Sequence, residues 1–159
     1  MISALHDSPV GKLTLISNGE ALTVLEFEAP RYPAKPAPPG DDAIITKTRK
    51  QLDAYFAGKL KAFDLPLAPE GTAFQQRVWA ALLKIPYGAT RSYGQQAVTI
   101  GSPKAVRAVG LANGRNPIAI IIPCHRVIGA NGSLTGYGGG MERKQLLLDL
   151  EQGAPQLRC

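Results

Sequence analysis

The first part of the chain alternates apolar and polar positions as paired strands do. Leu13 and Leu15 precede an Asn18-Gly19 pair, and a second apolar run of Leu22, Val24 and Leu25 follows it. Asn-Gly between two apolar runs is typical of a β-hairpin, because both turn residues tolerate positive φ. Residues 30–40 contain five prolines, which excludes a helix or a central strand, so this segment is expected to be a loop.

After this loop the apolar period becomes that of a helix. The positions that recur at helical spacing are Ile45, Thr48, Leu52, Tyr55 and Phe56. Asp41 or Asp42 is expected to cap this helix, and Gly58 to end it. The following Pro66, Pro69 and Gly71 favour a linker. We therefore expect antiparallel strands and one helix in residues 1–72.

Two capping signatures mark helix starts in the second half of the chain. Thr72 with Gln75, and Ser92 with Gln95, have the spacing at which each side chain bonds the other residue's amide. The first predicted helix has an apolar face made of Phe74, Val78, Ala81 and Leu82. The second is shorter and is expected to end near Gly101.

A third helix is predicted to follow, with Ser102 as its cap and Pro103 at its first position, where proline is tolerated. Two short helices joined by a tight glycine-containing turn meet the requirement of a helix-turn-helix. One face of the third helix should be buried, formed by Ala105, Val106, Val109 and Ala112. The opposite face, with Lys104, Arg107 and Leu111, suits a DNA groove, although an ordinary solvated helix can show the same pattern.

The next segments are an apolar run and a final amphipathic helix. Residues 118–122 are expected to be buried and extended. This run is far shorter than the ~20 residues of a membrane-spanning helix, and we expect no membrane partner. The last helix is predicted from about Met141 to Glu151, with Leu146, Leu147 and Leu150 inward.

The two halves of the chain differ in net charge. Residues 1–72 hold eight Lys+Arg against nine Asp+Glu, whereas residues 73–159 hold ten against three. A net +7 in the second half favours a polyanionic partner, nucleic acid first, although a merely soluble basic surface is the alternative. With 45% hydrophobic residues and no basic-apolar leader in residues 1–10, the chain is expected to be a folded cytoplasmic protein.

Cys124 is the candidate nucleophile. A cysteine reacts as the thiolate and needs a nearby base or positive charge, which His125 and Arg126 can supply. Adjacent Cys and His side chains usually diverge, so we expect a relay through water, with Glu151 orienting the imidazole. A buried structural cysteine beside a hydrogen-bonded histidine is the alternative. Cys159, the last residue, is expected to have no role, and the two cysteines to form no disulfide.

The motif Ile-Pro-Cys-His-Arg-Val at residues 122–127 resembles the active site of the O6-alkylguanine-DNA alkyltransferases, or methylated-DNA-protein-cysteine methyltransferases. Arg107-Ala108-Val109-Gly110 with Asn116-Pro117 resembles the family's recognition helix and turn, and Tyr137-Gly138-Gly139-Gly140 its closing loop. The first half resembles the family at Ser8-Pro9-Val10-Gly11 and Tyr55-Phe56-Ala57-Gly58. The resemblance implies one irreversible transfer of an alkyl group to Cys124, from O6-alkylguanine and also from O4-alkylthymine in DNA.

The resemblance also implies roles in nucleotide flipping. Arg107 would enter the base stack and fill the place of the flipped nucleotide. Tyr93 would contact the phosphate and donate a proton to guanine N3. Asn116 would tie the recognition helix to the turn that carries Cys124. The implied partner is double-stranded DNA with an alkylated guanine, bound by a monomer that can also bind cooperatively.

Further roles concern the pocket for the flipped base. The carbonyls of Cys124 and Val127 would accept from the exocyclic amine, while Tyr137 and the amide of Gly138 would face the other edge and O6. A well-studied family member has proline in the pocket wall where this chain has Ala119, which implies a wider pocket here. The zinc site of some members is not expected, because residues 1–72 lack cysteine and contain one histidine. We expect neither a metal nor a cofactor.

The sequence therefore predicts an α/β (α+β) protein with a supporting domain at residues 1–72 and a DNA-binding, alkyl-acceptor domain at 73–159. Two other functions stay open. A cysteine hydrolase would use the same three residue types, but it needs neither a helix-turn-helix nor an exposed arginine. A non-catalytic DNA-binding module would resemble the second half, but it would not need Cys124.

Overall fold

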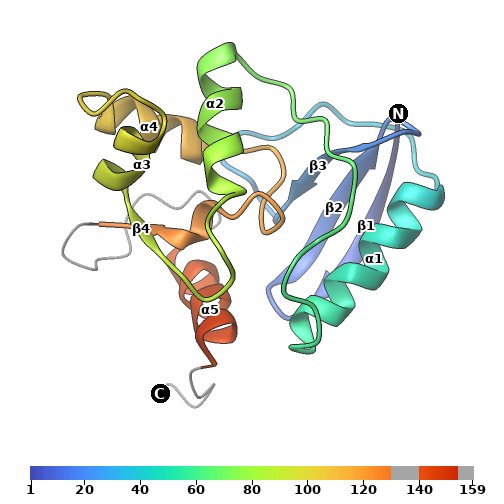
Figure 1. Cartoon of the computed structure of the whole chain (residues 1–159). Helices are drawn as coiled ribbons and strands as arrows, with labels where there is room; N and C mark the ends of the chain where they lie inside the picture. The colour runs from blue at the N-terminus through green and yellow to red at the C-terminus, as the bar shows by residue number, and fades with distance from the viewer. Residues whose placement is uncertain (130–139, 154–159) are drawn as a thin grey trace. The chain divides into compact units, whose positions relative to one another are not determined.

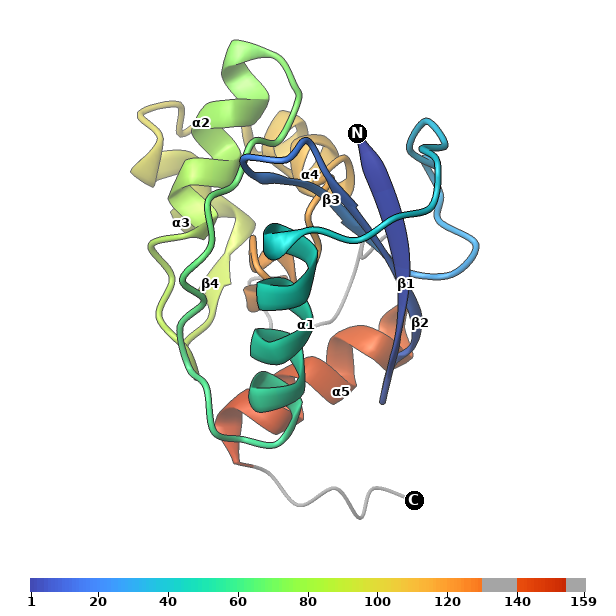
Figure 2. The same cartoon turned by 90° about the vertical axis from the view of Figure 1, so that its right-hand side faces the viewer.

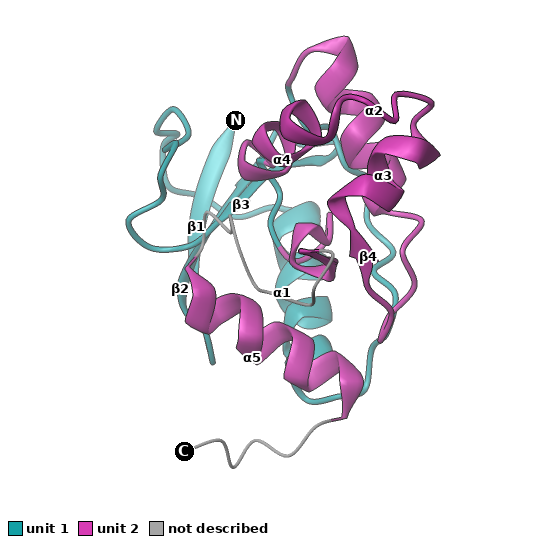
Figure 3. Ribbon diagram, turned by 90° about the vertical axis from the view of Figure 1, so that its left-hand side faces the viewer, with its two compact units in different colours: residues 1–70, 117–119 teal, residues 71–116, 120–159 magenta. Residues whose placement is uncertain are grey.

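The computed structural model describes residues 1–129 and 140–153. The chain forms two compact units, residues 1–70 with 117–119, and residues 71–116 with 120–159 (Figure 3). The assignment of residues 1–72 and 73–159 to a supporting and a DNA-binding domain stays a prediction. No helix of the described residues is long and apolar enough to span a bilayer.

The first unit is a three-stranded antiparallel sheet with one helix packed along it (Figures 1 and 2). The strands β1 (Ile2–Ser8), β2 (Gly11–Ser17) and β3 (Leu22–Glu26) follow one another in order, and α1 (Ala43–Phe56) contacts β1 and β2. The predicted hairpin is confirmed as β2 and β3, although its loop has four residues and only Gly19, at φ 92°, has positive φ. The sequence pattern did not indicate β1.

The helix α1 has the predicted cap and the predicted buried face. The side chain of Asp42 accepts from the amide of Ile45, which satisfies an otherwise unpaired first-turn amide. The buried positions are Ile45, Thr48, Leu52 and Tyr55, and Phe56 is half-buried. Gly58 follows the helix at φ 75°, a conformation that favours glycine.

Short chain segments pair with both edges of this sheet. Pro39, at the end of the predicted proline loop, forms a bridge with Ser3 of β1. Part of the predicted linker pairs with the edge strand β3. The amide of Leu22 donates to the carbonyl of Pro66, and the carbonyl of Leu22 accepts from the amide of Ala68, both at 2.9 Å. Residues 117–119 pair with β3 at Leu25. Such pairing reduces the unsatisfied backbone groups that an open edge would present.

The second unit is mainly helical. It contains α2 (Ala73–Leu82), α3 (Tyr93–Thr99), α4 (Val106–Gly114) and α5 (Met141–Gln152), with a parallel pair of two-residue strands, β4 (Arg91–Ser92) and β5 (Val127–Ile128). Both predicted capping boxes are present, at Thr72 with Gln75 and at Ser92 with Gln95. The helices α2, α3 and α4 gather together (Figures 1 and 3), and Trp79 Nε1 of α2 donates to the carbonyl of Ala112 at 2.9 Å.

The predicted helix-turn-helix is formed by α3 and α4, with two corrections. The proposed Ser102 cap is wrong, because the chain makes a turn in which the amide of Ala105 donates to the Ser102 carbonyl, and α4 starts only at Val106. Val106 is 40% exposed, because it stands in the first turn of the helix and not on the buried face. That face is formed by Val109, Ala112 and Asn113.

Two further expectations also need correction. Residues 118–122 are buried but not extended, since 119–121 form a turn in which Ile120 has φ 70°. The positive φ of Ile120 ends the extended conformation directly after residues 117–119, which pair with β3 at Leu25. In α5, Leu147 is buried as predicted, but Leu146 and Leu150 are only half-buried. The buried face of α5 is instead Lys144, Leu147, Leu148, Asp149 and Glu151.

Candidate active site

Cys124 begins a single 3-10 turn, Cys124–Arg126, directly before β5. β5 pairs in parallel with β4, with Arg91 opposite Val127 and Ser92 opposite Ile128. The helix α3 starts immediately after β4. This strand pair therefore ties the segment that carries Cys124 to the first helix of the helix-turn-helix.

Asn116 links the end of the recognition helix to the buried sulfur. Its Nδ2 donates to the carbonyl of Ile122 at 2.7 Å and to Sγ of Cys124 at 3.2 Å. Both contacts lie within the second unit. Asn116 thus contacts the turn that carries Cys124, which is the position that the family resemblance implied for it.

Glu151 is the carboxylate that meets His125, as the sequence suggested. His125 Nε2 lies 2.6 Å from Glu151 Oε2, and Arg126 donates through Nε to Oε1 at 2.6 Å and through Nη2 to Oε2 at 3.1 Å. Arg126 Nη1 also donates to the carbonyl of Ile85 at 2.6 Å. All three charged or ionisable side chains are buried. Buried charges need such partners, because isolated ones are strongly destabilising.

The imidazole of His125 is held by one nitrogen and leaves the other available. If Nε2 carries the proton, it donates to Glu151 and Nδ1 has a lone pair. Nδ1 is buried and has no hydrogen-bond partner among the residues that the structure describes. This arrangement presents Nδ1 as a base that is oriented through its opposite ring nitrogen.

Lys144 is a buried residue of the site that was not among the residues predicted from the sequence. It is 1% exposed, and its Nζ donates to the carbonyl of Val127 at 2.6 Å and lies 5.9 Å from the centre of the Tyr93 ring. A helical stripe at spacing i, i+3, i+4 and i+7 runs through Lys144, Leu147, Leu148 and Glu151. That stripe was the available signal that the lysine and the glutamate share the buried face.

Burial and charge act in opposite directions on the nucleophile. Burial raises the pKa of the Cys124 thiol, while the hydrogen bond from Asn116 and the positive charge of Lys144 lower it. Burial also lowers the pKa of His125, opposed by Glu151. The pKa of Lys144 is lowered by burial and raised by its interaction with Cys124. The resting site therefore favours a thiol beside a neutral imidazole.

The exposed face of α4 carries Arg107, Ala108 and Leu111. Gly110 lies on the side toward Tyr93, and a Cβ atom added there would be 3.9 Å from the tyrosine ring. Tyr93 is the first residue of α3. Arg107 and Tyr93 thus belong to adjoining helices.

The predicted pocket wall is only partly described. Tyr137 and Gly138 lie outside the described residues, and so does Cys159. Val127 is buried, and its carbonyl accepts from Lys144. Ala119 is buried in the first unit, where its amide donates to the carbonyl of Leu25 at 2.9 Å. A proline at position 119 would lose this bond, so Ala119→Pro changes the backbone as well as the side chain.

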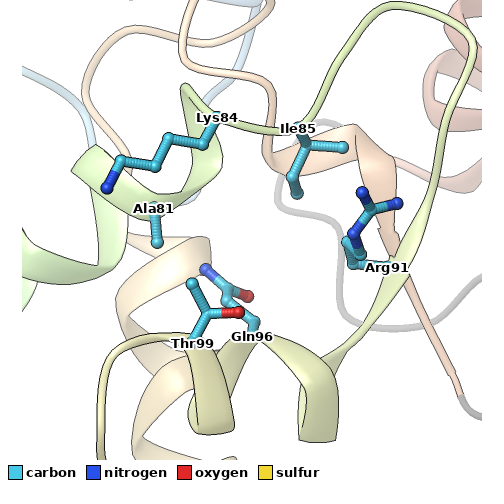
Figure 4. A pocket seen from close by; sticks show the side chains of 6 residues that line it. All are labelled: Ala81, Lys84, Ile85, Arg91, Gln96 and Thr99. Carbon is cyan, nitrogen blue, oxygen red and sulfur yellow. The ribbon is translucent and has the colours of Figure 1, made fainter.

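A separate pocket of about 180 Å³ lies beside α2 and α3. Figure 4 shows Lys84 and Arg91 on opposite sides of it. Gln96, at its floor, is already hydrogen-bonded with Asn113. The pocket is lined by Ala81, Lys84, Ile85, Arg91, Gln96 and Thr99, so it includes none of the predicted site residues.

The described residues contain no group of three or more His, Cys, Asp or Glu side chains that could hold a metal ion. The buried charged side chains of the candidate site are Lys144, Arg126 and Glu151.

Comparisons with known proteins cover both halves of the chain. The DNA-binding domain of 6-O-methylguanine DNA methyltransferase matches residues 73–153, and the ribonuclease-like domain of the same family matches residues 1–69. The methylated-DNA–protein-cysteine methyltransferase of Mycobacterium tuberculosis is 58% identical over 147 residues, covering 92% of this chain and 89% of the relative. The protein of that name from Methanosarcina acetivorans is 53% identical, covering 95% and 98%.

A solved structure of Mycobacterium tuberculosis OGT in complex with DNA is 55% identical, with a TM-score of 0.91, and the match covers 98% of this chain and 96% of that chain. The mixed α/β architecture agrees with the predicted fold class. Family models over both halves and relatives with more than half of their residues identical lead to one conclusion. The chain belongs to the 6-O-methylguanine DNA methyltransferase family.

Proposed function

We propose that this protein repairs DNA by taking the alkyl group of O6-alkylguanine onto the sulfur of Cys124, once per molecule. Relatives of high identity carry the name methylated-DNA–protein-cysteine methyltransferase. The observation that supports the assignment to Cys124 is its environment. Its buried sulfur accepts a hydrogen bond from Asn116, and the positive charge of Lys144 lowers the pKa of its thiol. The next residue is His125, whose Nδ1 has no hydrogen-bond partner among the described residues.

In the transfer step, the sulfur attacks the alkyl carbon and a C–S bond forms as the C–O6 bond breaks. The electron pair of the broken bond stays with the guanine. The thiol loses its proton and the guanine gains one, so a thioether and unmodified guanine result. Because a thioether is a poor leaving group, the sulfur is not regenerated and the protein acts once.

Deprotonation of the thiol is assigned to His125. The Nδ1 atom accepts the proton, directly or through a water, while Glu151 stabilises the imidazolium that forms. Arg126 holds both oxygens of that carboxylate in place. Lys144 stabilises the thiolate by its charge.

DNA binding is assigned to α3 and α4 of the basic half. Arg107, on the exposed face of α4, would replace the flipped nucleotide, and Tyr93 would contact a phosphate and protonate guanine N3. Val127, Ala119, Tyr137 and Gly138 would surround the flipped base. The protein is proposed to bind double-stranded DNA as a monomer, with cooperative binding along the duplex.

A titration of methyl transfer tests the proposal. A duplex with one labelled O6-methylguanine is added in excess, and the label on the protein is counted. The plateau is expected at one methyl group per chain, and at zero for Cys124→Ser with its affinity for the duplex retained. Continued turnover would refute the single-use mechanism. A second duplex with O4-methylthymine tests whether that lesion is also a substrate.

A further inference from the structure

Leu111 is a large apolar side chain on the exposed face of α4, as its position in the helix predicted. It is 67% exposed, the highest value among the large apolar side chains of the described residues. It lies four residues after Arg107 in α4, so the two side chains are neighbours on one helix face. The large side chains on this face are therefore one cation and one leucine, with Ala108 between them.

This leucine has no evident structural purpose. The packing of α4 within the second unit uses Val109, Ala112 and Asn113, which are buried on the other face. An isolated exposed leucine is common on protein surfaces and needs no explanation by itself. This one, however, lies one helical turn from the residue proposed to enter the base stack.

Base flipping creates a requirement that an arginine alone meets only in part. Removing a nucleotide from the stack exposes the faces of the neighbouring bases and the adjacent sugars. A guanidinium can hydrogen-bond in the vacated space and stack on a base face, whereas the sugars and the rest of the exposed apolar surface are covered best by an apolar side chain. Proteins that unstack bases from the minor groove often insert leucine or a similar wedge for this purpose.

We propose that Leu111 is a second DNA-contacting residue, which packs against the sugar and base beside the vacated position while Arg107 occupies that position. The proposal rests on the proposed function of α4 in DNA binding. Leu111 then stabilises the flipped state through apolar contact and takes no part in the chemistry at Cys124. Its contribution should appear only with duplex substrates.

The test compares single-turnover transfer from a methylated duplex with transfer from the free methylated base. Leu111→Ala should slow the duplex reaction roughly tenfold, which corresponds to the loss of one buried leucine contact. The reaction with the free base should be unchanged. Leu83→Ala is the matched control, since Leu83 is 51% exposed at the end of α2 and has no proposed contact with DNA.

Leu111→Lys separates apolar contact from charge. An added cation should tighten binding to undamaged duplex at low salt, yet transfer from the methylated duplex should still be slower than in the wild-type protein. Transfer at the wild-type rate in Leu111→Lys, or in Leu111→Ala, would overturn the proposal.

Arg107→Ala distinguishes the two levels of the proposal. If Arg107→Ala slows the duplex reaction and Leu111→Ala does not, the role of Leu111 is wrong and the proposed use of α4 stands. If neither substitution affects the duplex reaction, α4 does not enter the DNA, and both proposals are wrong. Thermal unfolding of each variant checks that these exposed substitutions leave the fold intact.

Discussion

The two units place their charged side chains in opposite environments. In the first unit every ion pair that the structure describes involves an exposed carboxylate, as in the pair of His6 with Asp53, whose aspartate side chain is 69% exposed. In the second unit Glu151 is almost fully buried and is shared by His125 and Arg126. The overall charge differs as well, near neutral in residues 1–72 and +7 in residues 73–159.

This difference separates ion pairs that solvent screens from ion pairs that are shielded from solvent. Exposed pairs contribute about 0–1 kcal/mol, because solvent screens them. A buried pair offsets a large desolvation cost and is often no more stabilising than an apolar pair of the same volume. The proposed role of His125 as the base for Cys124 gives this buried group a purpose beyond stability.

The largest expected effect is on stability. Glu151→Ala leaves Arg126 and His125 buried without their carboxylate, and should lower the free energy of unfolding by about 3–5 kcal/mol. Asp53→Ala removes the corresponding partner of His6 and should cost less than about 1 kcal/mol. Urea denaturation measures both. Equal losses would mean that burial does not distinguish the two units' ion pairs.

The next effect separates flipping from chemistry within the second unit. Base extrusion costs a few kcal/mol, so Arg107→Ala should slow transfer from duplex DNA by roughly a hundredfold and leave transfer from the free base nearly unchanged. His125→Ala should slow both, because both substrates need the thiolate. A similar loss on the free base in Arg107→Ala would place Arg107 in the architecture of the active site instead.

A smaller effect tests the charge asymmetry. The logarithm of the affinity for undamaged duplex should fall linearly with the logarithm of salt concentration, since phosphate contacts release counterions. Lys104→Ala in the basic half should reduce that slope by about 0.9 if Lys104 contacts a phosphate. Lys47→Ala in the first unit should leave the slope as it is. Identical slopes for the two variants would mean that the positive charge of residues 73–159 does not account for binding to the duplex.

The smallest effect concerns pH. Burial raises the pKa of Cys124 and Lys144 lowers it, so the thiolate fraction grows as pH rises through the alkaline range. Removing the lysine charge in Lys144→Ala raises the pKa further, so reaction with a small alkylating reagent at neutral pH should slow a few-fold. The rate profile should move to higher pH. Lys84→Ala is the control, and a profile moved to lower pH in Lys144→Ala would contradict the assigned electrostatics.

Local signals in the sequence located much of this fold. The capping boxes at Thr72 and Ser92 and the Asp42 cap depend only on neighbouring residues, and all three are present. The failures needed tertiary information. The apolar run at residues 118–122 contains a turn because the chain leaves β3 there, and no local pattern marks that position.

The candidate site also combines features that the local sequence indicates with features that depend on the tertiary structure. The Cys-His motif and the contact of Glu151 with His125 were accessible from the sequence. Lys144 was not recognised, because a lysine in an amphipathic helix is ordinarily exposed, and burial of this one depends on accepting groups from elsewhere in the fold. The carbonyl of Val127 supplies such a group. Tyr137 and Gly138 stay predictions.

The most direct test of the role of Cys124 is the mass of the intact protein before and after it meets a duplex with O6-methylguanine. The mass should increase by one CH2 group, since a methyl replaces the thiol proton, and peptide mapping should locate it on Cys124. The increase should be absent with unmethylated duplex. A methyl group on Cys159, or restoration of guanine without any change in protein mass, would contradict the assignment of Cys124 as the acceptor.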